Sequence, residues 1–240
     1  MKISIVVPSY NELKTLPQVL KRLAVLDLEK EVIVVDDGST DGTRAWLEKA
    51  IAAGEFPFEL KLLKHERNTG KGGALITGFK AVSGGVIIVQ DADMEYDPDD
   101  IPEIVRPISE GRADVVYGSR LLLNQSKIFN VFYLWGNQFL TFLVNLLFGS
   151  RITDSHTCYK AFSAPFLKTL NLSSSGFTID AEISCKIAFK KARFEEVPIV
   201  YSPRSREEGK KINCKDAFKC VLKIFWLRLT LRQIAAGDLR

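Results

Sequence analysis

Short, uninterrupted apolar runs that alternate with helical patterns constrain the fold of this 240-residue chain most strongly. Four such runs lie at residues 3–7, 32–35, 60–63 and 86–89. A strand that is buried on both faces, as in a parallel sheet, has this continuous apolar pattern. Because helical spacing of apolar residues follows each run, the order predicts a doubly wound α/β fold with a mostly parallel sheet flanked by helices.

Carboxylates follow two of these predicted strands. Asp37 comes just after the second run, and Asp91, Asp93 and Glu95 follow the fourth. In open α/β sheets, ligands bind at the carboxyl ends of the strands. Carboxylates gathered there repel one another, so we expect a hard divalent cation, Mg²⁺ or Mn²⁺, shared with the phosphates of a substrate. The alternative is an acidic loop that caps the next helix at Asp97.

The charge of the chain is uneven, and this narrows the class of partner. Residues 201–240 carry a net charge of +6, whereas the remainder carries −2. This asymmetry predicts an anionic partner near the C-terminus, which is a phosphate, an acidic lipid or a nucleic acid. Because the basic residues there alternate with Leu, Ile and Phe at helical spacing, we expect no nucleic acid. With only two histidines in the chain, a His-based metal site or a Ser/His/Asp triad is poorly supplied.

The most apolar stretch of the chain covers residues 128–148 and is long enough for a transmembrane helix. At about 100° per residue, its polar residues fall within an arc of roughly 100°. These residues are Asn130, Asn137, Gln138, Thr141 and Asn145. The pattern is typical of an interface helix, with its polar side on protein and its apolar side in lipid. A long core helix with one wet edge is the alternative.

A second amphipathic helix is predicted at the C-terminus. Residues 213–231 place basic and apolar side chains on different faces. We expect a basic amphipathic helix at 213–240 after a catalytic domain at 1–212, and a membrane surface as its partner. A solvated helix face is the alternative. The N-terminus, interrupted by Pro8 and Asn11, lacks the apolar core of a signal peptide.

Several motifs, taken in order, resemble the family 2 glycosyltransferases, and in particular the dolichyl- or polyprenyl-phosphate sugar synthases of the dolichol-phosphate mannosyltransferase type. They are VVPSYNE, VVDDGSTDGT, NTGKGGAL, QDADMEYDP, GSR, TDSHTCYKAF and a basic loop at 204–211. The resemblance spans residues 3 to about 212. It implies a GT-A fold, in which a Rossmann-like, mostly parallel sheet is flanked by helices, and two amphipathic interface helices.

The resemblance also implies a site for the nucleotide. Pro8, Tyr10 and Glu12 would line the nucleoside pocket, and Asp37 would contact the base or the ribose. The loop NTGKGGA lacks the spacing of a phosphate-binding P-loop. Its glycines therefore indicate either a close approach of the backbone to a ligand or tight packing.

The Asp-X-Asp motif of the family corresponds to Asp91, Ala92 and Asp93. The resemblance implies that Asp93 is the firmer metal ligand, with Asp91 and Glu95 also in the metal site. Glu95 stands where the mannosyl enzymes typically have Gln. Arg120 of the Gly-Ser-Arg motif would meet a phosphate.

Four further residues receive roles from the resemblance. Arg204 and Lys210 would close over the diphosphate and the acceptor phosphate. Asp180 and Glu182 match an acidic pair that would lie near the sugar.

A phosphate acceptor agrees with the chemistry that the chain can supply. The second pKa of a phosphate monoester is about 6, so the acceptor is largely a dianion at pH 7 and already a nucleophile. We therefore expect inverting, metal-dependent transfer of a hexose from UDP-glucose or GDP-mannose to dolichyl or polyprenyl phosphate. The enzyme would be peripheral on the cytoplasmic face of a membrane. The alternative is a soluble or glycan hydroxyl acceptor, which would need a general base.

Overall fold

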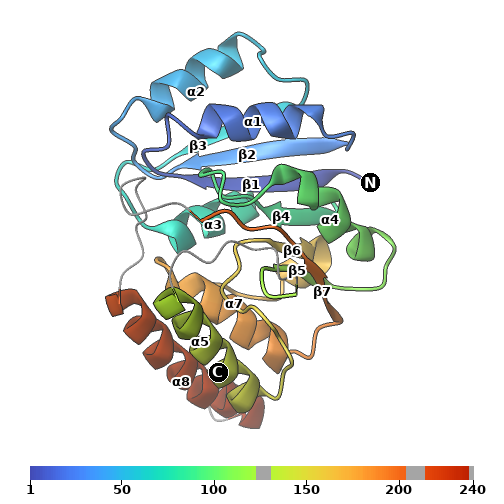
Figure 1. The fold of residues 1–240 in the computed structure, drawn as a ribbon, viewed down its shortest axis with the longest axis vertical. Coiled ribbons are helices and arrows are strands. Elements are labelled where there is room, and N and C mark those ends of the chain that lie inside the picture. Colours follow the sequence, from blue (N-terminus) through green and yellow to red (C-terminus); the bar gives the residue numbers. More distant parts are fainter. Residues whose placement is uncertain (123–130, 204–213, 238–240) are drawn as a thin grey trace.

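The computed structural model describes residues 1–122, 131–203 and 214–237. Within these ranges a seven-stranded sheet has the order β3-β2-β1-β4-β6-β5-β7 (Figure 1). In chain order the strands are β1 (Ile3–Ser9), β2 (Lys30–Asp36), β3 (Glu59–Lys64), β4 (Val86–Val89), β5 (Val115–Ser119), β6 (Lys160–Ser163) and β7 (Phe194–Pro198). The four apolar runs of the sequence are all strands of this sheet.

The sheet is mostly parallel, as predicted. β1 pairs in parallel with β2 and β4, β2 pairs in parallel with β3, and β5 pairs in parallel with β7. β6 is antiparallel to both β4 and β5, so β5 and β4 point the same way. The chain builds β1, β2 and β3 outward and then crosses to β4 on the other side of β1. The boundary between β1 and β4 is thus a topological switch point, where open α/β sheets bind ligands.

Helices cover both faces of the sheet. The helices are α1 (Leu16–Val25), α2 (Thr43–Ala52), α3 (Lys71–Lys80), α4 (Ile101–Ser109), α5 (Val131–Phe148), α6 (Ala164–Leu167), α7 (Thr178–Phe189) and α8 (Cys214–Ala236), with a 3₁₀ turn at Pro98–Asp100. The sheet has a hydrophobic core on each face. Alternate residues of β4 pack into one core or the other, because successive side chains of a strand point to opposite faces. Val86 and Ile88 pack with α1 and α4, whereas Ile87 and Val89 pack with α3, α5, α7 and α8.

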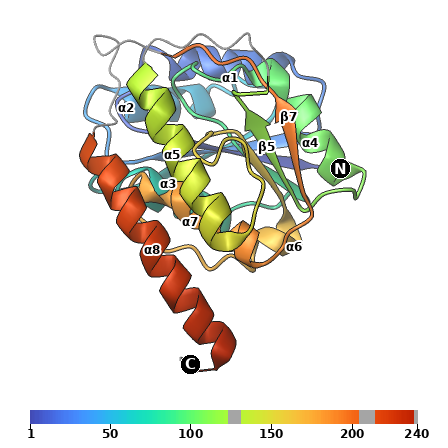
Figure 2. The same cartoon turned by 60° about the horizontal axis from the view of Figure 1, so that its bottom comes forward.

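α5 and α8 lie side by side on the outer side of α7 (Figures 1 and 2). Buried residues of α8, namely Cys220, Ile224 and Leu227, belong to the same core as β4 and α7. Within the described ranges, no helix combines the length and hydropathy needed to cross a bilayer. The boundary between residues 212 and 213 stays a prediction.

The polar face that the sequence assigned to α5 lies on protein. Thr141 is buried and bonds Ser155 Oγ at 2.8 Å, and Asn145 Nδ2 donates to Ile152 O at 2.8 Å. Asn137 donates to Asp154. Gln138, at the edge of the predicted arc, is exposed, and Asn130 lies outside the described residues.

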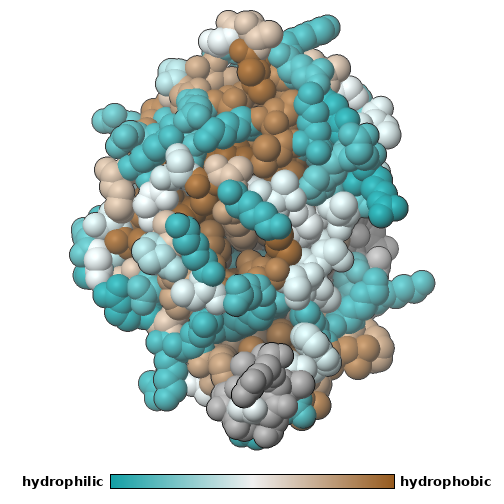
Figure 3. Space-filling view, turned by 180° about the vertical axis from the view of Figure 1, so that it is seen from behind, coloured by the Kyte–Doolittle hydropathy of each residue, from teal (hydrophilic) through white to brown (hydrophobic). Residues whose placement is uncertain are grey.

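The apolar side of α5 joins that of α8 in one exposed surface. Its members, each between 46% and 65% exposed, are Trp135, Phe139, Phe142, Leu146, Phe218, Leu222, Phe225, Trp226 and Leu229. We call this set the α5–α8 apolar surface. The face turned away from the viewer in Figure 1 carries another apolar area in its upper part, bordered by hydrophilic residues (Figure 3). The apolar side of α5 is therefore exposed, and its contact with a membrane stays a prediction.

Candidate active site

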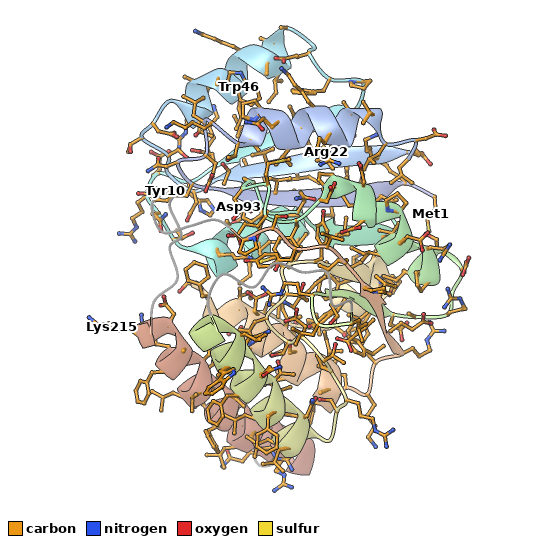
Figure 4. The ribbon with its side chains drawn as sticks, in the orientation of Figure 1. Met1, Tyr10, Arg22, Trp46, Asp93 and Lys215 are labelled. Atoms are coloured by element: carbon orange, nitrogen blue, oxygen red, sulfur yellow. The ribbon has the colours of Figure 1, made fainter. Side chains whose placement is uncertain are left out.

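The carboxyl ends of β1, β2, β4 and β5 meet at one edge of the sheet, because these strands all point the same way. Tyr10, Asp37 and Arg120 directly follow β1, β2 and β5, and Asp91 is the second residue after β4. Tyr10 and Asp93 lie toward this edge in Figure 4. The structure thus brings together the β-strand ends on which the sequence analysis placed the nucleotide, the metal and the phosphate.

The loop after β1 is held against the loop after β2. Asn11 Oδ1 accepts from Thr40 N at 2.8 Å, and Glu12 N donates to Thr43 Oγ1 at 3.2 Å. The carboxylate of Glu12 is buried and accepts from Thr15 Oγ1 at 2.7 Å. Pro8 is the penultimate residue of β1 and pairs with Val35 of β2. The predicted nucleoside residues therefore lie at the end of β1 and on the loops after β1 and β2, which are bonded to each other.

Asp37 is buried and organises the loop before α3. Its carboxylate accepts from Thr69 N at 2.9 Å and Gly70 N at 2.8 Å, and His65 Nδ1 lies 2.7 Å from Oδ1. A Cβ at Gly72 would lie 2.1 Å from Ser174 O. This glycine therefore serves tight packing, which is one of the two roles predicted for the NTGKGGA loop.

Lys71, the first residue of α3, is a site residue that the sequence analysis missed. Its Nζ lies 3.1 and 3.2 Å from the two carboxylate oxygens of Asp91 and 2.8 Å from Cys158 Sγ. Burial alone would lower the pKa of Lys71, but the charge of Asp91 raises this pKa well above its usual value. The signal was present as a lysine in a glycine-rich loop before a helix. Ala92, next to Asp91, is buried in the core.

Asp93 and Glu95 lie in a tight turn after Asp91. Asp93 Oδ1 accepts from Glu95 N at 3.1 Å, and Met94 between them has φ = 61°. Glu95 Oε2 accepts from Tyr201 OH at 2.6 Å. Among the described residues, no group of three or more His, Cys, Asp or Glu side chains is placed to hold a metal ion. The donor set fits a hard cation that takes one or two carboxylates and completes its shell with phosphates and water.

Arg120 forms a bidentate ion pair with Asp154. Nε and Nη2 lie 2.7 and 2.8 Å from the two carboxylate oxygens, and the guanidinium carbon lies 5.0 Å from the centroid of the Tyr201 ring. Burial would raise the pKa of Asp154, but the charge and hydrogen bonds of Arg120, with a hydrogen bond from Asn137, lower it to about 2. A guanidinium has five N–H donors. The ion pair uses two of them, so Arg120 keeps donors for a phosphate.

The acidic pair predicted on α7 is divided between two environments. Asp180 lies 2.6 Å from the Nζ of Lys160, which is buried. Glu182 accepts from Ser174 N at 2.7 Å and from Lys186 Nζ at 2.7 Å. Residues two positions apart on a helix point about 200° apart, so these carboxylates do not share a face.

Two of the predicted phosphate-binding residues, Arg204 and Lys210, lie outside the described residues. Among the described residues, the charges at the edge include the carboxylates of Asp37 and of the residues after β4, the ammonium of Lys71, and the guanidinium of Arg120. Both signs of charge in one partly buried region suit a ligand that carries phosphate together with a cation.

Comparison with solved structures agrees with this architecture. Glucosyl-3-phosphoglycerate synthase from Mycobacterium tuberculosis, solved in complex with uridine diphosphate, matches 95% of this chain and 80% of its own. The TM-score is 0.69 at 20% sequence identity. A further structure of that enzyme contains Mn²⁺, UDP-glucose and phosphoglyceric acid, with a TM-score of 0.68. At this identity the likeness establishes the GT-A fold.

Comparison of sequences gives the family. A dolichol-phosphate mannosyltransferase from Pyrococcus furiosus is 31% identical over 95% of this chain, which spans 64% of that protein's length. A UDP-N-acetylglucosamine–dolichyl-phosphate N-acetylglucosaminyltransferase from Methanococcus voltae is 30% identical over 95% of this chain and 96% of its own. The profile of the glycosyl transferase family 2 matches residues 4–170. The chain therefore belongs to glycosyltransferase family 2.

Proposed function

We propose that the chain transfers a hexose from a nucleotide sugar, UDP-glucose or GDP-mannose, to dolichyl or polyprenyl phosphate. The observation that carries the lipid acceptor is the exposed α5–α8 apolar surface. Its helix α5 reaches the charged residues through Asn137, which bonds Asp154, the partner of Arg120. The names of the sequence relatives, which include an undecaprenyl-phosphate mannosyltransferase from Micrococcus luteus at 30% identity, support the same class of acceptor.

The proposed reaction is a direct displacement at the anomeric carbon. An oxygen of the acceptor phosphate forms the new bond to this carbon. The bond from the carbon to the nucleoside diphosphate breaks, and its electron pair leaves with the diphosphate. Because the phosphate monoester is largely a dianion at pH 7, no side chain has to remove a proton from it. A single displacement inverts the configuration and gives a β-linked lipid-phosphate sugar.

The residues of the chain bind and orient the phosphates in this proposal. Asp93, with Asp91 and Glu95, would hold Mg²⁺ or Mn²⁺, which supplies charge stabilisation for the leaving diphosphate when bound. Arg120 would add hydrogen bonds that strengthen as negative charge develops on the diphosphate. Arg204 and Lys210 keep their proposed places over the diphosphate and the acceptor phosphate.

The donor occupies the switch point in this proposal. Pro8, Tyr10 and Glu12 line the nucleoside pocket, and Asp37 contacts the base or the ribose. Asp180 is the better placed of the two α7 carboxylates for a role beside the sugar, because its charge acts on Lys71, which bonds Asp91. Glu182 is engaged by Ser174 and Lys186 instead.

The α5–α8 apolar surface would seat the protein on the membrane that holds the acceptor. α8 carries Lys215, Lys219, Lys223, Arg228 and Arg232 against a single acidic residue, Asp216. Basic residues beside an exposed apolar face bind anionic bilayers, and each cation adds about 1 kcal/mol near the surface. We place the protein on the cytoplasmic side, where nucleotide sugars are made.

A donor screen with lipid extraction tests this proposal. The purified protein is incubated with Mg²⁺ or Mn²⁺, a short polyprenyl phosphate and radiolabelled UDP-glucose, UDP-GlcNAc or GDP-mannose in turn. We expect label in the organic phase with one donor, and its loss on chelation. The matched control variant, Arg120→Lys, keeps the charge but loses the bidentate fork and should transfer less label.

A soluble acceptor is the second candidate. The structural neighbour that was solved with phosphoglyceric acid supports it, because that acid is small and water-soluble. Release of nucleotide with a soluble phosphate or glycan acceptor, without label in the lipid from any donor, would replace the lipid proposal by this one.

A further inference from the structure

One buried carboxylate joins α5 to the candidate phosphate-binding arginine. Asn137 Nδ2 of α5 donates to Asp154 Oδ1 at 2.8 Å. The same carboxylate accepts from Arg120 through Nε, Nη2 and the backbone N–H, at 2.7, 2.8 and 3.2 Å. Asp154 therefore lies between the helix that carries the exposed aromatic residues and the edge of the sheet that carries the site.

In the Asp154–Arg120 pair, only the arginine is exposed to solvent. The side chain of Asp154 is 0% exposed, whereas that of Arg120 is 18% exposed. Bidentate pairing fixes the plane of a guanidinium as well as its position. The donors of Arg120 that Asp154 does not use are consequently presented in one orientation, which depends on where the Asp154 carboxylate is held.

Asn137 differs from the other polar residues of α5. Thr141 and Asn145 attach the helix to Ser155 and to the backbone of Ile152. These bonds attach α5 to residues 152–155 and involve no charged side chain. Asn137 instead donates to the carboxylate of Asp154. Attaching α5 to the protein does not by itself require this bond to a charged group.

The chain of contacts continues to the candidate metal site. Arg120 lies over the ring of Tyr201, and the Tyr201 hydroxyl donates to Glu95 at 2.6 Å. A displacement of Asn137 would thus change the position of Arg120 and, through Tyr201, that of Glu95.

We propose that Asn137 is a positioning residue that sets the orientation of Arg120 through Asp154. Through it, the orientation of the phosphate-binding donors depends on the placement of α5, the helix that would lie in the membrane. The assignment of a phosphate to Arg120 rests on the proposed function, whereas the positioning itself does not.

A measurement on Arg120 itself tests the positioning without any ligand. The side-chain Nε–H signal of Arg120 is identified by NMR from its loss in Arg120→Lys. Because this N–H donates to a fully buried carboxylate, its exchange with water is slow in the native protein. In Asn137→Ala the exchange should become at least tenfold faster. In Asn145→Ala, which loosens α5 without touching Asp154, and in the exposed Gln138→Ala, it should change less than twofold. Equal effects of Asn137→Ala and Asn145→Ala would overturn the proposal.

A second experiment asks whether the orientation matters for phosphate binding. Affinities for UDP, GDP and farnesyl phosphate, each with Mg²⁺, are measured by calorimetry for the native protein, Asn137→Ala, Arg120→Gln and the double variant. We expect at least one probe to bind three- to tenfold more weakly to Asn137→Ala, with no further loss in the Arg120→Gln background.

The outcomes of this cycle separate the two proposals. A loss of affinity that persists without Arg120 shows that Asn137 acts by another route and overturns the positioning role. If the NMR signal responds but no probe binds the native protein, Asn137 positions Arg120 and the proposed function fails.

Discussion

At the scale of single residues, the two aspartates of the Asp-X-Asp motif have different partners. Asp91 is paired with the half-buried ammonium of Lys71, whereas Asp93 Oδ1 accepts from the backbone N–H of Glu95. The charge of Asp91 is thus already balanced within the protein. We infer that Asp93 contributes more to cation binding and Asp91 more to stability.

The variant Asp93→Asn tests this division. The amide oxygen can still accept from Glu95 N, so the turn is retained while the charge is lost. We expect Mn²⁺ affinity in the presence of nucleotide, measured by electron paramagnetic resonance, to fall at least tenfold. The melting temperature should fall less than in Asp91→Asn, because the amide oxygen still accepts from the N–H of Glu95.

The companion variant, Asp91→Asn, should show the opposite balance. It leaves the Lys71 ammonium without its carboxylate. Breaking one side of a fully buried ion pair costs about 3–5 kcal/mol. Because the side chains of Lys71 and Asp91 are 11% and 15% exposed, we expect a smaller loss here, of about 1–3 kcal/mol. Chemical denaturation measures this loss. Native-like Mn²⁺ binding by Asp93→Asn would contradict the assignment of the metal to Asp93.

At the scale of elements, α5 and α8 provide their own reporters of membrane binding. Of the three tryptophans in the chain, Trp135 and Trp226 lie in the α5–α8 apolar surface, whereas Trp46 packs against the core. If this surface enters a bilayer, two indole rings leave water and their fluorescence shifts to shorter wavelength. Anionic vesicles should produce the shift and neutral vesicles a weaker one, because α8 is basic.

Substitutions in the same surface should weaken vesicle binding. Burying an aromatic side chain fully is worth about 1.5–3 kcal/mol. Partial burial of Phe139 and Phe225 should therefore contribute about 1 kcal/mol each, or about fivefold in the partition coefficient. The double variant Phe139→Ser/Phe225→Ser is compared in a flotation assay with Val25→Ser, which removes an exposed apolar residue of α1. Self-association that these changes abolish, without any vesicle binding by the native chain, would identify the surface as a contact between copies.

Elements were predictable where local pattern decides them. The apolar runs gave the strands, because a strand buried on both faces must be apolar throughout. The side of α5 that faces protein followed from its Asn and Thr spacing, because buried polar groups need partners. The antiparallel β6 was not predictable in direction, because a short strand has the same side-chain pattern in either direction.

At the scale of the whole molecule, long-range pairing explains what the sequence concealed. The Lys71–Asp91, Arg120–Asp154 and Lys160–Asp180 pairs join residues 20 or more positions apart. No local pattern encodes such partners, since they depend on which loops the sheet order brings together. The resemblance to a family indicated Asp91, Asp93 and Arg120, but it did not indicate what holds each of them in place.

Acid stability is a property of the whole molecule, and one half-buried histidine ring contributes to it. The Nδ1 of His156 lies 2.8 Å from Ser155 Oγ, and within the described part of the chain its Nε2 is buried without a hydrogen-bond partner. Burial lowers the pKa of His156 to about 4, against the opposing charges of Asp180 and Asp154, while Lys160 and Arg120 lower it further. The folded protein therefore binds the proton less readily than the unfolded chain, whose histidine has a pKa of about 6.5.

The sign of the pH dependence follows from this difference. The unfolded state binds more protons between pH 4 and pH 6.5, so the free energy of unfolding decreases as the pH falls through this window. The decrease due to His156 should be on the order of 2 kcal/mol, allowing for its partial exposure. Urea denaturation of the native chain and of His156→Gln at pH 7.5, 5.5 and 4.5 isolates the contribution of His156 to the free energy of unfolding, since all other groups titrate in both proteins. The difference in stability between the two should shift in favour of the variant as the pH falls. A constant difference across the three pH values would show that the pKa of His156 is the same in the folded and the unfolded protein.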